Sequence, residues 1–135
     1  MTTMPLLYIA APYRAPTVDG IRDNIRFVER MSAWVLGLGV YPVAPHLLTS
    51  FMDGRVGDEK ILATTLELMR RCDAVLVVKR KASMSRGVSL EYDEALRLKM
   101  VHAIFGPMGD DSLPYPGDPT HDFVGRLGAR AYVAS

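Results

Sequence analysis

The sequence predicts an α/β fold, a three-layer sandwich in which a parallel sheet of four or five strands lies between helices. Short apolar runs alternate with longer segments of helical periodicity, in the order β-α-β-α-β-α-β. The runs are apolar throughout, as is typical of parallel strands that are buried on both faces. Right-handed crossovers then place helices on both faces, and ligands bind beyond the carboxyl ends of the strands.

The first half of the chain supplies two of these strands. Residues 6–11 form a short apolar run that Pro12 ends, which predicts a buried strand. A helix follows, with Thr17 or Asp19 as its N-cap, and glycines at its end. The next strand, residues 40–44, contains a proline and is therefore expected at a sheet edge or a strand end.

The second half continues the alternation. Residues 47–57 read as a loop long enough to act as a lid, and residues 58–71 as a helix. An apolar strand over 74–78 precedes a helix that reaches about residue 100, and a fourth strand covers 101–105. Residues 106–120 are rich in Gly, Pro and Asp and predict an extended loop. Residues 129–133 are expected to add a fifth strand or a docked tail.

Composition limits the possible classes of protein. A chain of 135 residues with 49% hydrophobic and 23% charged residues is expected to form one globular domain over residues 1–135. The net charge of +1 gives no general attraction for nucleic acid or a membrane surface. With one cysteine, Cys72, neither an intrachain disulfide nor a cysteine-based zinc cluster is possible. We find no signal peptide or membrane span, and expect a cytoplasmic protein without a metal or cofactor.

Residues 85–95 are the centre of the predicted binding site, because they combine a small polar loop after a strand with the start of a helix. Ser85 offers a hydroxyl and Gly87 a close backbone approach to an anion, and the first N–H groups of the helix point the same way. Helical periodicity places Glu91 on an otherwise apolar, sheet-facing side. The alternative is a first-turn glutamate that favours the helix dipole. Arg86 and the basic residues 79–81 flank this loop, either as a solvated rim or as a local attraction for phosphate.

The topology brings candidate residues together at one sheet edge. Four segments are expected to converge there: residues 11–14, residues 45–46, residues 83–87 and the start of the last loop. The gathered side chains are those of Tyr8, Arg14, His46, Ser85 and Glu91. Taken singly, three of them also have ordinary interpretations: Tyr8 as a core tyrosine, Arg14 as a solvated arginine and His46 as a surface or strand-end histidine.

The absence of several known motifs limits the reactions that this protein is expected to catalyse. The sequence has no Gly-x-x-x-x-Gly-Lys loop, no Gly-x-Gly-x-x-Gly after the first strand, and no Gly-x-Ser-x-Gly elbow. None of the three histidines has metal-ligand spacing with another. A carboxylate nucleophile remains, and such a group suits displacement at an anomeric carbon. We expect the helix N-terminus to keep Glu91 ionised at neutral pH.

Four motifs in this order resemble the nucleoside 2-deoxyribosyltransferase superfamily, in particular its small bacterial and phage branch. They also resemble the deoxynucleoside 5′-monophosphate N-glycosidases. The motifs are Tyr-Ile-Ala-Ala-Pro-Tyr-Arg at 8–14, Pro-His at 45–46, Cys-Asp-Ala-Val at 72–75, and Ser-x-Gly-x-x-x-Glu-x-x-x-Ala at 85–95. The resemblance covers about residues 6–105 and implies a flavodoxin- or Rossmann-like sheet, usually in a homodimer.

The resemblance also implies roles for residues. The glutamate that matches Glu91 attacks C1′ and expels the base, and the tyrosine that matches Tyr8 positions this glutamate. In the nucleotide hydrolases, the residues matching Arg14 and Ser85 lie at the 5′-phosphate, and the histidine matching His46 lies near the sugar or the base. Transferases often carry an acid where Ser85 stands, so Ser85 favours a nucleotide as the small-molecule partner.

One position departs from the pattern. The hydrolases carry an aspartate near the base, eight residues before the aspartate that matches Asp73, and here that position is Thr65. Either Asp58, Glu67 or a lid residue protonates the leaving base instead, or the protein binds without efficient turnover. Two hypotheses follow: an enzyme of the N-glycosidic bond of a nucleoside or nucleotide, or a module that binds a nucleotide derivative.

Overall fold

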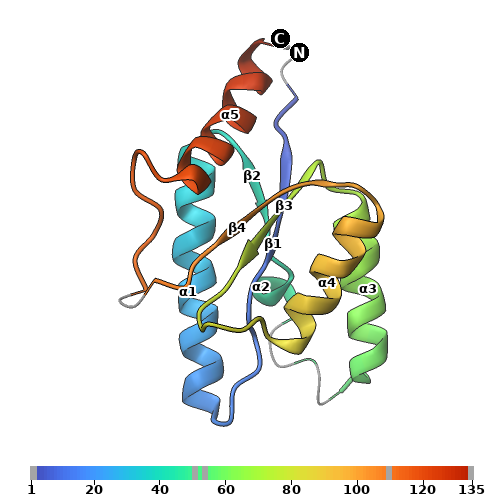
Figure 1. Ribbon diagram of the computed structural model, residues 1–135. Coiled ribbons are helices and arrows are strands. Elements are labelled where there is room, and N and C mark those ends of the chain that lie inside the picture. The colour runs from blue at the N-terminus through green and yellow to red at the C-terminus, as the bar shows by residue number, and fades with distance from the viewer. Residues whose placement is uncertain (1–2, 50–51, 53–54, 109–110, 134–135) are drawn as a thin grey trace.

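The structure, a computed structural model, describes residues 3–49, 52, 55–108 and 111–133. Its strands form one parallel sheet in the order β2-β1-β3-β4 (Figure 1). This confirms the predicted α/β class, which is Rossmann- or flavodoxin-like, with four strands. The elements in chain order are β1 (Leu6–Ala10), α1 (Val18–Gly37), β2 (Tyr41–Val43), α2 (Pro45–Thr49), α3 (Asp58–Arg70), β3 (Ala74–Val78), α4 (Arg86–Arg97), β4 (Val101–Phe105) and α5 (Pro119–Val133).

The two central strands explain the apolar runs of the sequence. Every residue of β3 is fully buried, and so is β1 from Leu7 onward. Strand β2 pairs with β1 alone among the described strands, so Pro42 stands at a sheet edge, as predicted. Thr17 caps α1, since its hydroxyl accepts a hydrogen bond from the Gly20 N–H at 3.0 Å.

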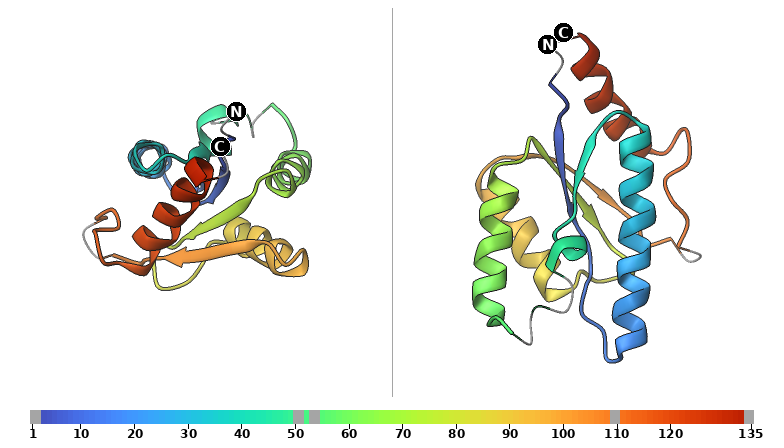
Figure 2. Two further views of the ribbon diagram at one scale, coloured as in Figure 1. Left: turned by 90° about the horizontal axis from the view of Figure 1, so that it is seen from above. Right: turned by 180° about the vertical axis from the view of Figure 1, so that it is seen from behind.

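Helices cover both faces of the sheet (Figure 2). Helices α1 and α5 pack on one face, in a cluster that includes Leu7 and Ile9 of β1. Helices α3 and α4 pack on the other face, in a cluster that includes Tyr8 and Ala10. Successive residues of a strand point to opposite faces, so this alternation directs Tyr8 toward α3 and α4.

The end of the chain differs from its prediction. Residues 129–133 belong to helix α5 and form no strand. The helix docks on the sheet through Val124 and Leu127, which are buried against the α1 side of the core. Gly128 lets it come close, because a Cβ there would lie 2.0 Å from the carbonyl oxygen of Leu38. Helix α5 contains two glycines, Gly125 and Gly128, which lower its helix propensity. Tertiary packing outweighs this low propensity.

The predicted lid also contains structure. Residues 45–49 form the short helix α2, although a loop was expected from residue 47. Residues 50–51 and 53–54 of the predicted lid lie outside the described residues. Within the described part of the chain, we find no helix with the length and apolar character that a membrane crossing requires.

Candidate active site

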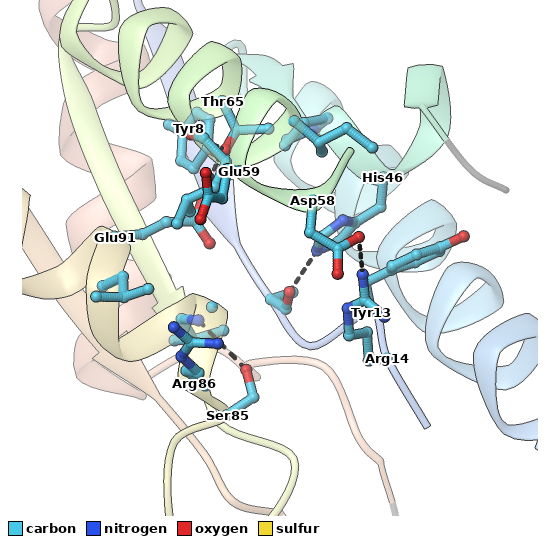
Figure 3. A pocket seen from close by; sticks show the side chains of 17 residues that line it. Tyr8, Tyr13, Arg14, His46, Asp58, Glu59, Thr65, Ser85, Arg86 and Glu91 are labelled. Carbon is cyan, nitrogen blue, oxygen red and sulfur yellow. Dashed lines mark hydrogen bonds and ion pairs between the residues drawn. The ribbon is translucent and has the colours of Figure 1, made fainter. Parts of the chain in front are cut away.

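A cavity of about 350 Å³ lies at the carboxyl end of β1, between the loop after β1, α2, α3 and the start of α4 (Figure 3). Three of the four segments that were expected to converge meet here. The start of the last loop does not line the cavity, because the chain after β4 turns to the α1 face, where Asp111 pairs with Arg80. All of the predicted site residues line the cavity: Tyr8, Arg14, His46, Ser85, Gly87 and Glu91.

Tyr8 and Glu91 form a buried pair in the wall of this cavity. Tyr8 is 0% exposed and Glu91 is 5% exposed. The phenol O–H of Tyr8 donates a hydrogen bond to Oε2 of Glu91. Helix α4 also buries Val88 and Ala95, so its periodicity turns Glu91 toward the sheet. The pair thus results from the strand alternation of β1 and the helical periodicity of α4.

The protonation of Glu91 differs from the expectation. Burial raises the pKa of Glu91 to about 7, although the hydrogen bond from Tyr8 acts in the opposite direction. Glu91 follows Arg86, the first residue of α4, by five positions, so it lies past the first turn, where the helix dipole acts most strongly. At neutral pH Glu91 is therefore about half ionised and not fully ionised as expected, because burial disfavours the charged form.

Tyr8 keeps its proton. Burial and the neighbouring carboxyl group of Glu91 raise the pKa of Tyr8 well above its usual value. The phenol is therefore a hydrogen-bond donor at physiological pH. Such a donor holds one carboxylate oxygen in place and leaves the other oxygen available to the cavity.

Contacts with Ala11 and Tyr13 help to hold His46 in place. Its Nε2–H donates to the carbonyl oxygen of Ala11, and its ring stacks on Tyr13 with centroids 5.4 Å apart and planes inclined by 20°. Burial lowers the pKa of His46, so the ring is neutral at pH 7. The histidine therefore joins α2 to the loop after β1 and presents an aromatic surface to the cavity.

The start of α4 forms one rim of the cavity. The hydroxyl of Ser85 accepts a hydrogen bond from the N–H of Val88 at 3.3 Å and caps the helix. A Cβ on Gly87 would meet no described atom within 4 Å, so this position leaves open space beside the first turn. Arg86 also lines the cavity, whereas Arg80 pairs with Asp23 and Asp111. Of the basic residues around this loop, Arg86 is thus available to a ligand and Arg80 is engaged elsewhere.

Arg14 stands on the other side of the opening. Its Nη2 lies 2.5 Å from Oδ1 of Asp58, and Figure 3 shows this pair across the cavity from Ser85 and Arg86. Both side chains are more than half exposed, at 62% and 67%. Water therefore screens their attraction, and an incoming anion competes with Asp58 for Arg14 at modest cost.

Helix α3 forms the remaining wall, and sequence reasoning identified it only in part. Asp58, Glu59, Leu62 and Thr65 line the cavity, whereas Glu67 forms ion pairs with Arg70 and Arg71 and does not line it. Of the acids weighed as proton donors, Asp58 is thus at the site and Glu67 is not. Glu59 was missed, because two consecutive acids at a helix start have the ordinary interpretation of dipole partners.

The described residues contain no cluster of three or more His, Cys, Asp or Glu side chains that could hold a metal ion. The cavity instead combines the buried carboxyl group of Glu91, an O–H donor, two arginines, the two carboxyl groups at the start of α3, and apolar side chains from α3 and α4. Such a lining fits a small organic ligand with an anionic end.

Comparisons with known proteins agree with this fold. No curated protein matches the chain. A solved structure that matches is described as a 2-desoxiribosyltransferase from Leishmania mexicana, with a TM-score of 0.56 and 23% sequence identity. The match covers 75% of this chain and 63% of the other protein, so this chain spans less than two thirds of that neighbour. Residues 5–105 match the family described as "Domain of unknown function (DUF7768)", and the chain therefore belongs to this family.

Proposed function

We propose that this protein cleaves or transfers the N-glycosidic bond of a nucleoside or a nucleoside 5′-monophosphate, with Glu91 as the nucleophile. The single observation that carries the proposal is the buried Tyr8–Glu91 pair in the wall of an open cavity. Burying a carboxyl group costs free energy that a solvated helix glutamate does not incur. The cavity, at about 350 Å³, also falls within the range of small-molecule sites.

The reaction proceeds in two displacements. A carboxylate oxygen of Glu91 attacks C1′, the C1′–N bond breaks, and its electron pair leaves with the base, which takes up a proton. The glycosyl ester on Glu91 then reacts at C1′ with water, giving hydrolysis, or with a second base, giving transfer. Tyr8 donates its O–H to one oxygen of Glu91 throughout and orients the other oxygen.

The rim residues provide the anion-binding end. In the proposed complex the 5′-phosphate lies at the first turn of α4, held by N–H groups near Gly87 and the hydroxyl of Ser85. Arg14 exchanges Asp58 for the phosphate and closes the opposite side. His46 and Tyr13 face the sugar or the base. The chain resembles enzymes with this arrangement, and a 2-desoxiribosyltransferase shares its fold.

A second function is favoured by one observation. Thr65 stands where the resembled hydrolases carry an aspartate near the base, and a threonine hydroxyl is a poor acid. A module that binds a nucleotide derivative without turning it over would retain the cavity and the rim and need no proton donor.

A panel assay separates the two functions. The protein is incubated with the nucleosides and 5′-monophosphates of all common bases, in ribose and 2′-deoxyribose form, and free base is measured by chromatography. We expect at least one substrate to release base with the wild type and none with Glu91→Gln. Binding of a nucleotide without release of any base would support the binding module, and release by Glu91→Gln at the wild-type rate would refute the nucleophile.

A further inference from the structure

The proposed reaction leaves one requirement unmet by the Tyr8–Glu91 pair, namely a proton for the departing base. Tyr8 directs its proton to Glu91 and is strongly disfavoured as an acid, because burial raises its pKa. Thr65 donates its hydroxyl proton to the carbonyl oxygen of Leu62 at 2.9 Å. Among the described residues, the remaining candidates for the donor are the other side chains that line the cavity.

Two carboxyl groups on α3 meet this condition, and they differ in their contacts. Asp58 is engaged by Arg14 at 2.5 Å. Glu59 also lines the cavity, and its carboxyl group has no hydrogen-bond or ion-pair partner among the described residues. The Asp58 carboxyl group is directed to Arg14 at the opening of the cavity, whereas no described group holds that of Glu59. Glu59 is therefore the better placed acid.

The geometry of α3 supports this choice. Glu59, Leu62 and Thr65 follow one another at helical spacing along the cavity wall, with Thr65 beside Tyr8. Six residues of helix separate Glu59 from the level of Thr65, a rise of about 9 Å. A nucleobase and the extended Glu59 side chain together span such a distance, since the base accepts its proton at a ring nitrogen or an exocyclic oxygen away from C1′. In Figure 3 the side chain of Glu59 extends from α3 on the side of the cavity where Tyr8 and Glu91 lie.

We propose that Glu59 is the general acid that protonates the leaving base. As the C1′–N bond breaks, the carboxyl proton of Glu59 passes to the base, so that a neutral base departs and Glu59 becomes a carboxylate. In the second step this carboxylate takes a proton from the attacking water, which restores the acid. This assignment rests on the proposed function.

The test compares two leaving groups. One substrate is the natural nucleotide that the panel assay selects, and the other is the 4-nitrophenyl glycoside of the same 5-phosphorylated sugar. Because 4-nitrophenolate leaves without protonation, its release does not need a general acid. We expect Glu59→Gln to slow release of the natural base by 100-fold or more and to change release of 4-nitrophenol by less than threefold. Glu67→Gln, the same substitution on the same helix outside the cavity, serves as the control and should leave both rates unchanged.

The outcomes separate this inference from the function on which it rests. Equal slowing of both substrates by Glu59→Gln, or no slowing of either, would overturn the role of Glu59. The same selective loss in Asp58→Asn, with Glu59→Gln unaffected, would assign the acid to Asp58 instead. A wild type that releases neither leaving group refutes the proposed function and with it the acid.

Discussion

Replacing Glu91 by glutamine should make the protein more stable at alkaline pH while it abolishes turnover. Glutamine has nearly the same shape and accepts the same hydrogen bond from Tyr8, but it cannot ionise. The wild-type carboxyl group has a folded pKa of about 7 against a reference value of 4.5. Each pKa unit corresponds to about 1.4 kcal/mol, so the buried carboxyl group costs about 3 kcal/mol of stability once it is ionised in both states.

The sign follows from proton binding. Between pH 4.5 and about 7 the unfolded chain has released the Glu91 proton and the folded protein still holds it. The wild type therefore loses stability as the pH rises through this window, and the loss is complete above pH 7. Glu91→Gln lacks this loss and should match the wild type near pH 4. At pH 8.5 it should exceed the wild type by about 3 kcal/mol, or very roughly 10 °C in Tm.

Denaturant titrations at pH 4.5, 6 and 8.5 measure the effect, with Glu67→Gln as a control for removing an exposed carboxyl group. Glu67 forms surface ion pairs with Arg70 and Arg71, so its substitution should change stability by less than about 1 kcal/mol. A Glu91→Gln variant that is less stable than the wild type at pH 8.5, or a difference that does not depend on pH, would refute the reasoning that burial raises the pKa of Glu91.

Three further predictions concern Tyr8, Arg14 and Gly128. Tyr8→Phe should lower kcat less than Glu91→Gln does, because it removes orientation and not the attacking atom; steady-state rates of base release test this, and equal losses would contradict it. Arg14→Ala should weaken binding of a 5′-monophosphate about tenfold or more and leave the nucleoside unaffected, since a charge-assisted contact is worth about 1.5–3 kcal/mol; calorimetry with both ligands decides, and equal changes would exclude a phosphate contact. Gly128→Ala should destabilise the fold, because its Cβ would lie 2.0 Å from a backbone oxygen, whereas Gly125→Ala meets nothing within 4 Å and should be neutral or stabilising; thermal melts compare the two, and similar effects would contradict the docking of α5.

Most of the fold was predictable, because continuous apolar runs mark buried parallel strands and an amphipathic helix separates each run from the next. Helix α5 was not, because Gly125 and Gly128 weaken its local signal and only packing against Leu38 and the core reveals why a glycine is needed. Helical periodicity also sufficed to turn Glu91 toward the sheet, whereas its pairing with Tyr8 was expected from the resemblance.

Other features of the site depend on distances that periodicity does not provide. The desolvation of Glu91 arises from the elements packed around it, so its raised pKa was not foreseen. The pairing of Arg14 with Asp58 joins a loop to a helix start across 44 positions of sequence, and no local sequence pattern predicts it. Glu59 shares this difficulty, since adjacent acids at a helix start have a sufficient local explanation.

The central claim is that Glu91 forms a covalent bond to the sugar, and intact-protein mass spectrometry tests it most directly. The wild type is incubated with a 2-fluoro-2-deoxy sugar analogue of the best substrate, whose fluorine slows breakdown of the glycosyl ester more than its formation. We predict a mass increase equal to one fluorosugar, which peptide mapping places on Glu91 and which is missing in Glu91→Gln. An adduct on any other residue, or base release by the wild type with no adduct under trapping conditions, would contradict the account.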